Sequence, residues 1–351
     1  MACTSPMHMA VIKFNDAKEA WHFKSLHNDN GWKYNIEHKR AYRIVAKNSR
    51  NVDIEAALKG YCHEIMEVPC GNCVNCRLSY SRDWANRATF EANQYKYNWF
   101  ITLTYDDEHI HKGKFENFTL NSDDYTAFIK AVRQRFQRDY NHIGIKMLGC
   151  GEYGGTTMRP HLHILLFNLP LPDLTIDFND GKGQISHHYD SRGVPYMFSQ
   201  IIKDCWPYGN ILIADCNWNT SAYVSQYVLK KQKGNDAKVY KQLGILPPFL
   251  RMSNGLGLGY YETHKEQLAD IPSLYIPREH KKPLSCGIPR YYRNKLKDEG
   301  LIDYEVSIEQ AKNSEEKARS LLAGKIKINT SRQLKEEKLK AFNFVKERKL
   351  I

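Results

Sequence analysis

The segment that decides the fold reads Pro160-His161-Leu162-His163-Ile164-Leu165-Leu166-Phe167. Its aliphatic content and its length predict a β-strand. Because successive side chains of a strand point to opposite faces, His161 and His163 share one face, while Leu162, Ile164 and Leu166 share the other. The segment therefore presents two imidazoles side by side over a buried apolar layer.

These two imidazoles form a candidate metal site. Neutral imidazoles at this spacing suit a divalent metal that also takes a harder ligand and keeps positions open for water or a phosphate oxygen. Glu152, at the end of a preceding strand candidate, is available as the third ligand, and residues 153–159, with two Gly, can turn the chain between the strands. An isolated His-x-His is more often a pair of partly exposed histidines, and this arrangement alone would also suit a hydrolase.

A second candidate feature is the tyrosine pair Tyr223 and Tyr227, which lie four residues apart on a predicted helix. At that spacing the two phenols project in nearly the same direction. A phenol has a pKa near 10 and attacks a phosphodiester at neutral pH only if the phosphate is polarised and the developing charge is neutralised. A metal would do the first, and Lys230 or Lys231 would help with the second. Standing alone, such a pair is usually part of a packing stripe.

The neighbouring elements indicate an α+β fold. Strands are predicted at residues 99–105, 146–152 and 210–214, and helices at 79–95, 199–206 and 221–233, the last capped by Asn219 or Thr220. A further helix begins at Ser122 or Asp123 and ends near residue 140. Several strands are half-polar, which favours an antiparallel sheet packed by helices over a doubly wound parallel sheet.

Composition narrows the partners. The 351 residues include 51 Lys or Arg against 39 Asp or Glu, and the resulting net charge of +12 favours a polyanionic partner such as nucleic acid. We find neither an apolar stretch of the length that a membrane span needs nor a signal peptide, so we expect a cytoplasmic protein with no membrane partner.

A cysteine cluster precedes the first predicted helix. Cys70, Cys73 and Cys76 are separated by two-residue gaps, which is typical of half a zinc knuckle, and Cys62 or His63 is near enough to supply a fourth ligand. Three reduced structural cysteines at a tight turn are an almost equal alternative. The arginines that follow, Arg77, Arg82 and Arg87, would then line a DNA channel.

Three ordered motifs resemble those of the HUH endonucleases. They are Phe100-Ile-Thr-Leu-Thr-Tyr105, Glu152 with Pro160-His-Leu-His163, and Tyr223-x-x-x-Tyr227 followed by Lys230. Over roughly residues 60 to 260 the pattern is more closely similar to the replication initiators of gokushovirus-type microviruses, which are small single-stranded DNA phages. The similar cysteine run in those initiators supports a role for the cluster.

The resemblance implies a five-stranded antiparallel sheet flanked by helices, with Mg²⁺ or Mn²⁺ bound by His161, His163 and Glu152. It implies a rolling-circle initiator that nicks single-stranded origin DNA through Tyr223 or Tyr227, leaves a 5′-phosphotyrosyl link and a 3′-OH primer for the host replication machinery, and later rejoins the displaced strand. The host bacterial cytoplasm would be its location. Gln226 stands where many relatives have Lys, so charge neutralisation is expected to shift to Lys230.

The expected organisation has five parts. They are an N-terminal region of unknown role (1–60), the Cys cluster and basic helix (61–97), the endonuclease core (98–235), a Gly- and Pro-marked extension (236–300) and a charged helical tail (301–351). Residues 255–259, Gly-Leu-Gly-Leu-Gly, lack the Lys-Ser/Thr of a phosphate loop and are expected to turn tightly. The alternative function from another class is a non-catalytic zinc-knuckle protein that binds nucleic acid.

Overall fold

The computed structural model describes residues 7–27, 32–35, 39–45, 61–71, 73–179, 185–191, 193–230, 235–271, 273–278 and 281–302. The chain divides into two compact units, residues 1–79 and 80–351. The predicted tail at 301–351 lies almost entirely outside the described residues.

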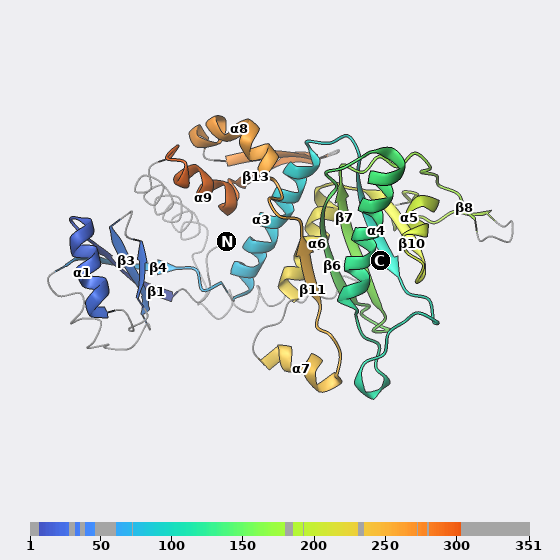
Figure 1. Cartoon of the computed structure of the whole chain (residues 1–351), viewed down its shortest axis with the longest axis horizontal. Helices are drawn as coiled ribbons and strands as arrows, with labels where there is room; N and C mark the ends of the chain where they lie inside the picture. Colours follow the sequence, from blue (N-terminus) through green and yellow to red (C-terminus); the bar gives the residue numbers. More distant parts are fainter. Residues whose placement is uncertain are drawn as a thin grey trace, which may run out of the picture. The chain divides into compact units, whose positions relative to one another are not determined.

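The second unit is built on the five-stranded antiparallel sheet that the sequence predicts (Figure 1). Its strand order is β10-β5-β7-β6-β11, so β7 lies at the centre. The strands are β5 (Asn98–Thr104), β6 (Lys146–Tyr153), β7 (Pro160–Phe167), β10 (Ile211–Asp215) and β11 (Phe249–Met252). The fifth strand, β11, thus comes from the Gly- and Pro-marked region, where no strand was predicted.

Both faces of this sheet are covered. On one face, Leu162, Ile164 and Leu166 join a core with α4 (Ser122–Tyr140) and α5 (Gln200–Asp204). On the other face, Leu165 and Phe167 join a second core with α3 (Val74–Ala92) and α6 (Trp218–Lys230). The helices lie on opposite sides of the sheet in Figure 1. Every residue of β7 is buried except His161, so the central strand is not half-polar but enclosed by two apolar layers.

Three helix starts differ from those predicted. The side chain of Asn121 accepts from Asp123 N and caps α4, so the cap is one residue before Ser122. Asn217, rather than Asn219 or Thr220, caps α6 by accepting from the backbone N–H groups of both of those residues. Helix α3 begins at Val74, five residues before the predicted start. A short polar side chain just before a helix satisfies its first unpaired N–H groups, and a neighbouring polar residue can do so at a shifted start.

The region after α6 packs onto α3 of the same unit. It holds α7 (Asn235–Leu243), α8 (Leu258–Asp270), β12 (Ser273–Arg278), β13 (Lys281–Gly287) and α9 (Arg290–Asp298). The tight turn expected at residues 255–259 is present, because Gly255 and Gly257 have φ of +64° and +80°. Arg87 of α3 donates to Leu256 O at 2.7 Å and is only 8% exposed. The interpretation of Arg87 as a DNA-channel residue is therefore wrong, because its guanidinium is used to hold this turn.

The first unit contains a sheet that the sequence did not reveal. Its order is β2-β3-β1-β4, with β1 (Met7–Lys13), β2 (Lys33–Asn35), β3 (Arg40–Val45) and β4 (Cys62–Val68). Helix α1 (Ala17–His27) packs Ala20 and Phe23 against Ala10 and Ile12 of this sheet. The described part of residues 1–60 is therefore an α/β layer with its own small core.

Short elements complete the description. They are the 3-10 turn η1 (Lys114–Glu116) and the two-residue strands β8 (Phe178–Asn179) and β9 (Ile185–Ser186). Within the described residues, no helix has both the length and the apolar character required to cross a membrane.

Candidate metal and nucleophile site

Strand register brings the three predicted metal ligands together. Glu152 of β6 pairs directly with His161 of β7, and His163 follows two residues later on the same face. Glu152 Oε1 lies 3.1 Å from His161 Nε2 and 3.1 Å from His163 Nε2. The carboxylate and His163 are 4% and 3% exposed, whereas the His161 side chain is 19% exposed. The site is therefore a buried pocket of donors with one side open to solvent.

Each imidazole is fixed by its other nitrogen. His161 Nδ1 lies 3.2 Å from the carbonyl oxygen of Arg159, which can only accept, so Nδ1 carries the proton and Nε2 keeps its lone pair. His163 Nδ1 lies 3.0 Å from Thr102 Oγ1, on the adjacent strand β5. Partners of this kind orient metal-binding histidines and set their tautomer.

The donor set fits a divalent cation. All three ligand atoms lie within 4.8 Å of one another, and neighbouring ligands of an octahedral ion at about 2.1 Å are separated by about 3 Å. Two neutral imidazoles and one carboxylate, with the remaining positions open, suit Mg²⁺ or Mn²⁺ with water or a phosphate oxygen as further ligands.

Tyr223 of α6 points at these donors. Its hydroxyl donates to Glu152 Oε1 at 3.2 Å and lies 3.2 Å from His163 Nε2. The ring of Phe100 packs edge-on against Tyr223 and stacks on His163, so one β5 side chain positions both. The adjacent Val224 is fully buried against the sheet. Buried contacts on either side therefore fix the helix with its phenol over the donor triad.

The other two predicted catalytic residues are placed only by their backbone. Tyr227 and Lys230 lie on α6, one and two turns after Tyr223. Their side chains lie outside the described part of the structure, and Lys231 lies outside it altogether. The helical spacing of the tyrosine pair is thus present in the backbone.

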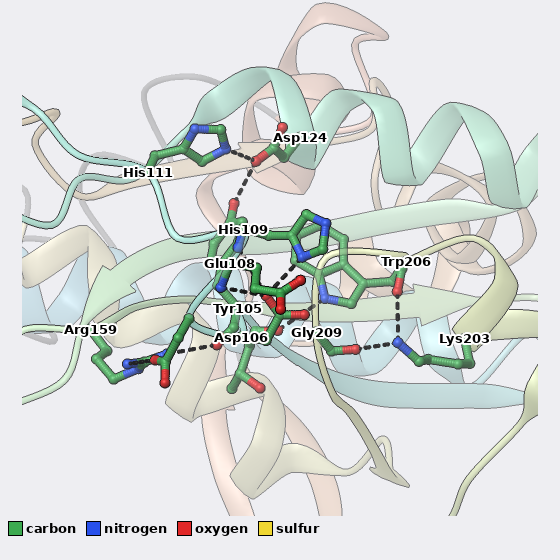
Figure 2. Close-up of polar contacts among 12 residues, drawn as sticks. Tyr105, Asp106, Glu108, His109, His111, Asp124, Arg159, Lys203, Trp206 and Gly209 are labelled. Carbon is green, nitrogen blue, oxygen red and sulfur yellow. Dashed lines mark hydrogen bonds and ion pairs between the residues drawn. The ribbon is translucent and has the colours of Figure 1, made fainter. Parts of the chain in front are cut away.

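A polar network supports the loop that carries the Arg159 carbonyl (Figure 2). Arg159 donates to Tyr105 O at 3.0 Å and pairs with Asp107 at 2.6 Å. On the α4 side, Tyr105 donates to Asp124 Oδ2 at 2.9 Å, and His111 Nε2 lies 2.6 Å from the same oxygen. Burial, and next the negative charge of Asp124, raise the pKa of Tyr105 well above its usual range. This tyrosine therefore stays neutral and serves as a hydrogen-bond donor.

Sequence reasoning missed several of these supporting residues. Thr102 faces the same way as His163 because the two pair directly across β5 and β7, and the alternation of the predicted strand was a signal that pointed to it. His109 and His111 were expected to be solvated, but each has a carboxylate partner, Asp106 at 2.7 Å and Asp124 at 2.6 Å. No local pattern in the sequence indicates those pairings.

The cysteine cluster is a second group of converging donors, in the first unit. The sulfur atoms of Cys70, Cys73 and Cys76 lie within 4.8 Å of one another. Of the proposed fourth ligands, His63 is exposed, with Nδ1 at 2.9 Å from Tyr61 O, and does not join the cluster. The side chain of Cys62 lies outside the described residues.

Comparison with known proteins gives consistent matches over the site. Residues 98–232 match the family model for the replication-associated protein ORF2. The chain is 37% identical over 244 residues to replication-associated protein ORF2 of Spiroplasma virus 4, covering 68% of this chain and 71% of that one. It is 32% identical over 232 residues to replication-associated protein VP4 of Bdellovibrio phage phiMH2K, covering 64% and 66%. Replication-associated protein ORF4 of Chlamydia phage 1 is 27% identical over 247 residues, covering 68% and 57%. No solved structure matches the chain.

Proposed function

The chain belongs to the family of microvirus replication-associated proteins, and on that premise we propose that it starts rolling-circle replication by nicking single-stranded origin DNA. In this proposal it is an HUH endonuclease and strand transferase. The family membership supports a role in phage DNA replication and hence DNA binding. The chemistry rests on the site.

The observation that carries the proposal is the position of the Tyr223 hydroxyl, 3.2 Å from both Glu152 Oε1 and His163 Nε2. A tyrosine used only for packing has no need to direct its hydroxyl at a set of metal ligands. A nucleophile must lie beside the ion that polarises the phosphate it attacks, because reacting atoms have to approach within about 3 to 3.5 Å.

The residues of the chain have distinct tasks in the cut. His161, His163 and Glu152 would hold Mg²⁺ or Mn²⁺, which when bound polarises the scissile phosphate and orients it. The phenol of Tyr223 gives its proton to Glu152 Oε1 and its oxygen bonds to phosphorus. The bond from phosphorus to the 3′ oxygen breaks, and that oxygen takes up a proton from water. The products are a 5′-phosphotyrosyl link and a free 3′-OH.

The second tyrosine explains how a circle is released. Tyr227 follows Tyr223 by one helical turn, so we assign the first cut to Tyr223 and the terminal cut to Tyr227. The newly freed 3′-OH then attacks the first phosphotyrosyl link and rejoins the displaced strand. Lys230, one turn further on, neutralises the charge that develops on the phosphate. The host DNA polymerase extends the primer, and the reaction takes place in the cytoplasm of the bacterial host.

A non-catalytic zinc-knuckle protein is the competing function. It would use the cysteine cluster and leave the tyrosine pair to packing. The donor triad speaks against it, because two of its three members are buried polar groups, and burying such groups carries a desolvation cost that a purely binding protein has no reason to bear at this place.

Covalent capture separates the two functions. Full-length protein is incubated with Mn²⁺ and single-stranded oligonucleotides tiled across the DNA that surrounds its gene, and adducts are resolved on denaturing gels. We expect an adduct with the wild type and with Tyr140→Phe, which removes an exposed hydroxyl on α4. We expect none with Tyr223→Phe. Normal nicking by the double variant Tyr223→Phe/Tyr227→Phe would refute the nucleophile assignment.

A second variant tests the metal role separately from binding. His161→Ala should abolish cleavage and largely preserve affinity for single-stranded DNA, because contacts to phosphates and bases elsewhere remain. Cleavage and binding are measured on the same oligonucleotide, the latter by fluorescence anisotropy. Equal loss of both would assign β7 to DNA binding instead of catalysis.

A further inference from the structure

The cysteine cluster of the first unit lies at the junction between a strand and a helix. Cys70 follows β4, and Cys73 and Cys76 lie at the start of α3, which begins at Val74. Gly71 between them has a φ of +71° and would meet no atom within 4 Å if it carried a Cβ. The left-handed conformation at Gly71 therefore serves to turn the chain, and the turn directs three thiols toward one point.

We propose that Cys70, Cys73 and Cys76 bind one zinc ion as thiolates, at a site separate from the catalytic metal and independent of the nicking reaction. Three sulfurs within 4.8 Å of one another are the first reason. Sulfur ligands on one tetrahedral zinc, at about 2.3 Å from the ion, are about 3.8 Å apart. Small side-chain rotations therefore suffice to close the site.

Backbone amides already point at two of these sulfurs. Cys73 N donates to Cys70 Sγ at 3.2 Å, and Cys76 N donates to Cys73 Sγ at 3.5 Å. Hydrogen bonds to the charged form of a thiol favour that form, and so does the positive end of a helix, where Cys73 and Cys76 lie. Both effects stabilise the thiolates that a soft divalent ion requires.

The spacing of the sulfurs argues for a single ion. In a [4Fe–4S] cluster each cysteine binds a different iron, so its sulfurs stand farther apart than around one ion. Thiolates also select zinc over the hard cations Mg²⁺ and Mn²⁺. Among the described residues the cluster has three donor side chains, so a water molecule or a donor outside those residues takes the fourth position.

Other thiols of the chain lack these features. Burial raises the pKa of Cys286 to about 11, which keeps this thiol protonated at neutral pH. It belongs to the second unit and packs against a separate core. Cys286→Ser is therefore a matched control that removes one sulfur without touching the cluster.

The bound zinc has a structural role. The first unit has a core cluster of only seven buried residues among those described, and small units commonly need a metal or disulfide to supplement such a core. A zinc ion at this place ties the end of β4, which pairs along the whole of β1, to the start of α3. Its loss should loosen β1, β3 and β4.

Metal analysis of the full chain tests the proposal. Protein purified under reducing conditions and dialysed against Mg²⁺ without zinc should retain about one zinc per chain by mass spectrometry. Cys286→Ser and His161→Ala should retain it as well, since neither alters the cluster. Cys70→Ser, Cys73→Ser and Cys76→Ser should each lose it. Retention in all three serine variants, or loss in His161→Ala, would overturn the assignment.

A second measurement does not depend on the folding of variants. Wild-type protein stripped of metal and titrated with Co²⁺ should develop the near-ultraviolet charge-transfer band of cobalt thiolate, with saturation at one equivalent. Hydrogen exchange of the stripped protein should rise in β1, β3 and β4 and stay unchanged in β5 and β7. Absence of the band, several irons per chain, or disulfide-linked cysteines in the reduced preparation would each exclude the zinc site.

Discussion

Replacing Thr102 by valine tests how the metal site is held. The change keeps the shape of a β-branched strand residue and removes only the hydroxyl, which lies 3.0 Å from His163 Nδ1. His163 is 3% exposed, so water cannot easily take over this bond. An unsatisfied buried donor costs about 1 to 3 kcal/mol. A metal ion on Nε2 makes the opposite N–H a stronger donor, so the loss falls mainly on the metal-bound state.

The expected result is a weaker metal site with an intact fold. The cost corresponds to roughly a 10- to 100-fold loss of Mn²⁺ affinity, the usual effect of removing such a supporting residue. Mn²⁺ binding is measured directly by electron paramagnetic resonance and by the Mn²⁺ dependence of adduct formation. Thr104→Val is the control, because Thr104 Oγ1 contacts Asn210 O, at 3.4 Å, and no metal ligand. An unchanged affinity in Thr102→Val, or an equal loss in Thr104→Val, would refute the reasoning.

Three further predictions concern stability and reactivity. Gly149→Ala should lower the free energy of unfolding by about 1 to 3 kcal/mol in urea titrations, because a Cβ there would lie 2.6 Å from a buried tyrosine hydroxyl of α4, whereas Gly155→Ala, with no atom within 4 Å, should be neutral. Lys146→Met should cost about 3 kcal/mol, because it leaves the fully buried Glu91 carboxylate without the ammonium 2.8 Å away. A change below about 1 kcal/mol would contradict this. Burial raises the pKa of Cys286 to about 11, so at pH 8 only about one molecule in a thousand carries the thiolate. Alkylation of this thiol, followed by mass spectrometry, should therefore accelerate about tenfold per pH unit up to that pKa, and a pH-independent rate would contradict the shift.

The sequence predicts the site well because its signals are local. Alternation of polar and apolar residues defined β5 and β7 to within one residue, and it assigned His161 and His163 to one face. The turn length between β6 and β7 was enough to bring Glu152 to the same end. Residues four apart on a helix share a face, which placed the tyrosine pair.

Features that depend on distant pairing could not be predicted in this way. β1 pairs with β4 across about fifty residues of chain, and no short-range pattern in those strands indicates the partner. Arg87 looks like a DNA-binding residue in sequence because a helical arginine is usually exposed. Only the fold reveals that the carbonyl of Leu256, far along the chain, is its partner.

The last strand to join the main sheet has a consequence for how much of this chain can be removed. β11 covers β6, the strand that carries Glu152, and its Phe249 packs over Gly151. A fragment ending before β11 would keep every proposed catalytic residue and yet expose the backbone amides and carbonyls of a glycine-containing edge. Such edges recruit strands from other molecules. Shortened versions of this protein should therefore aggregate although their proposed catalytic residues are complete.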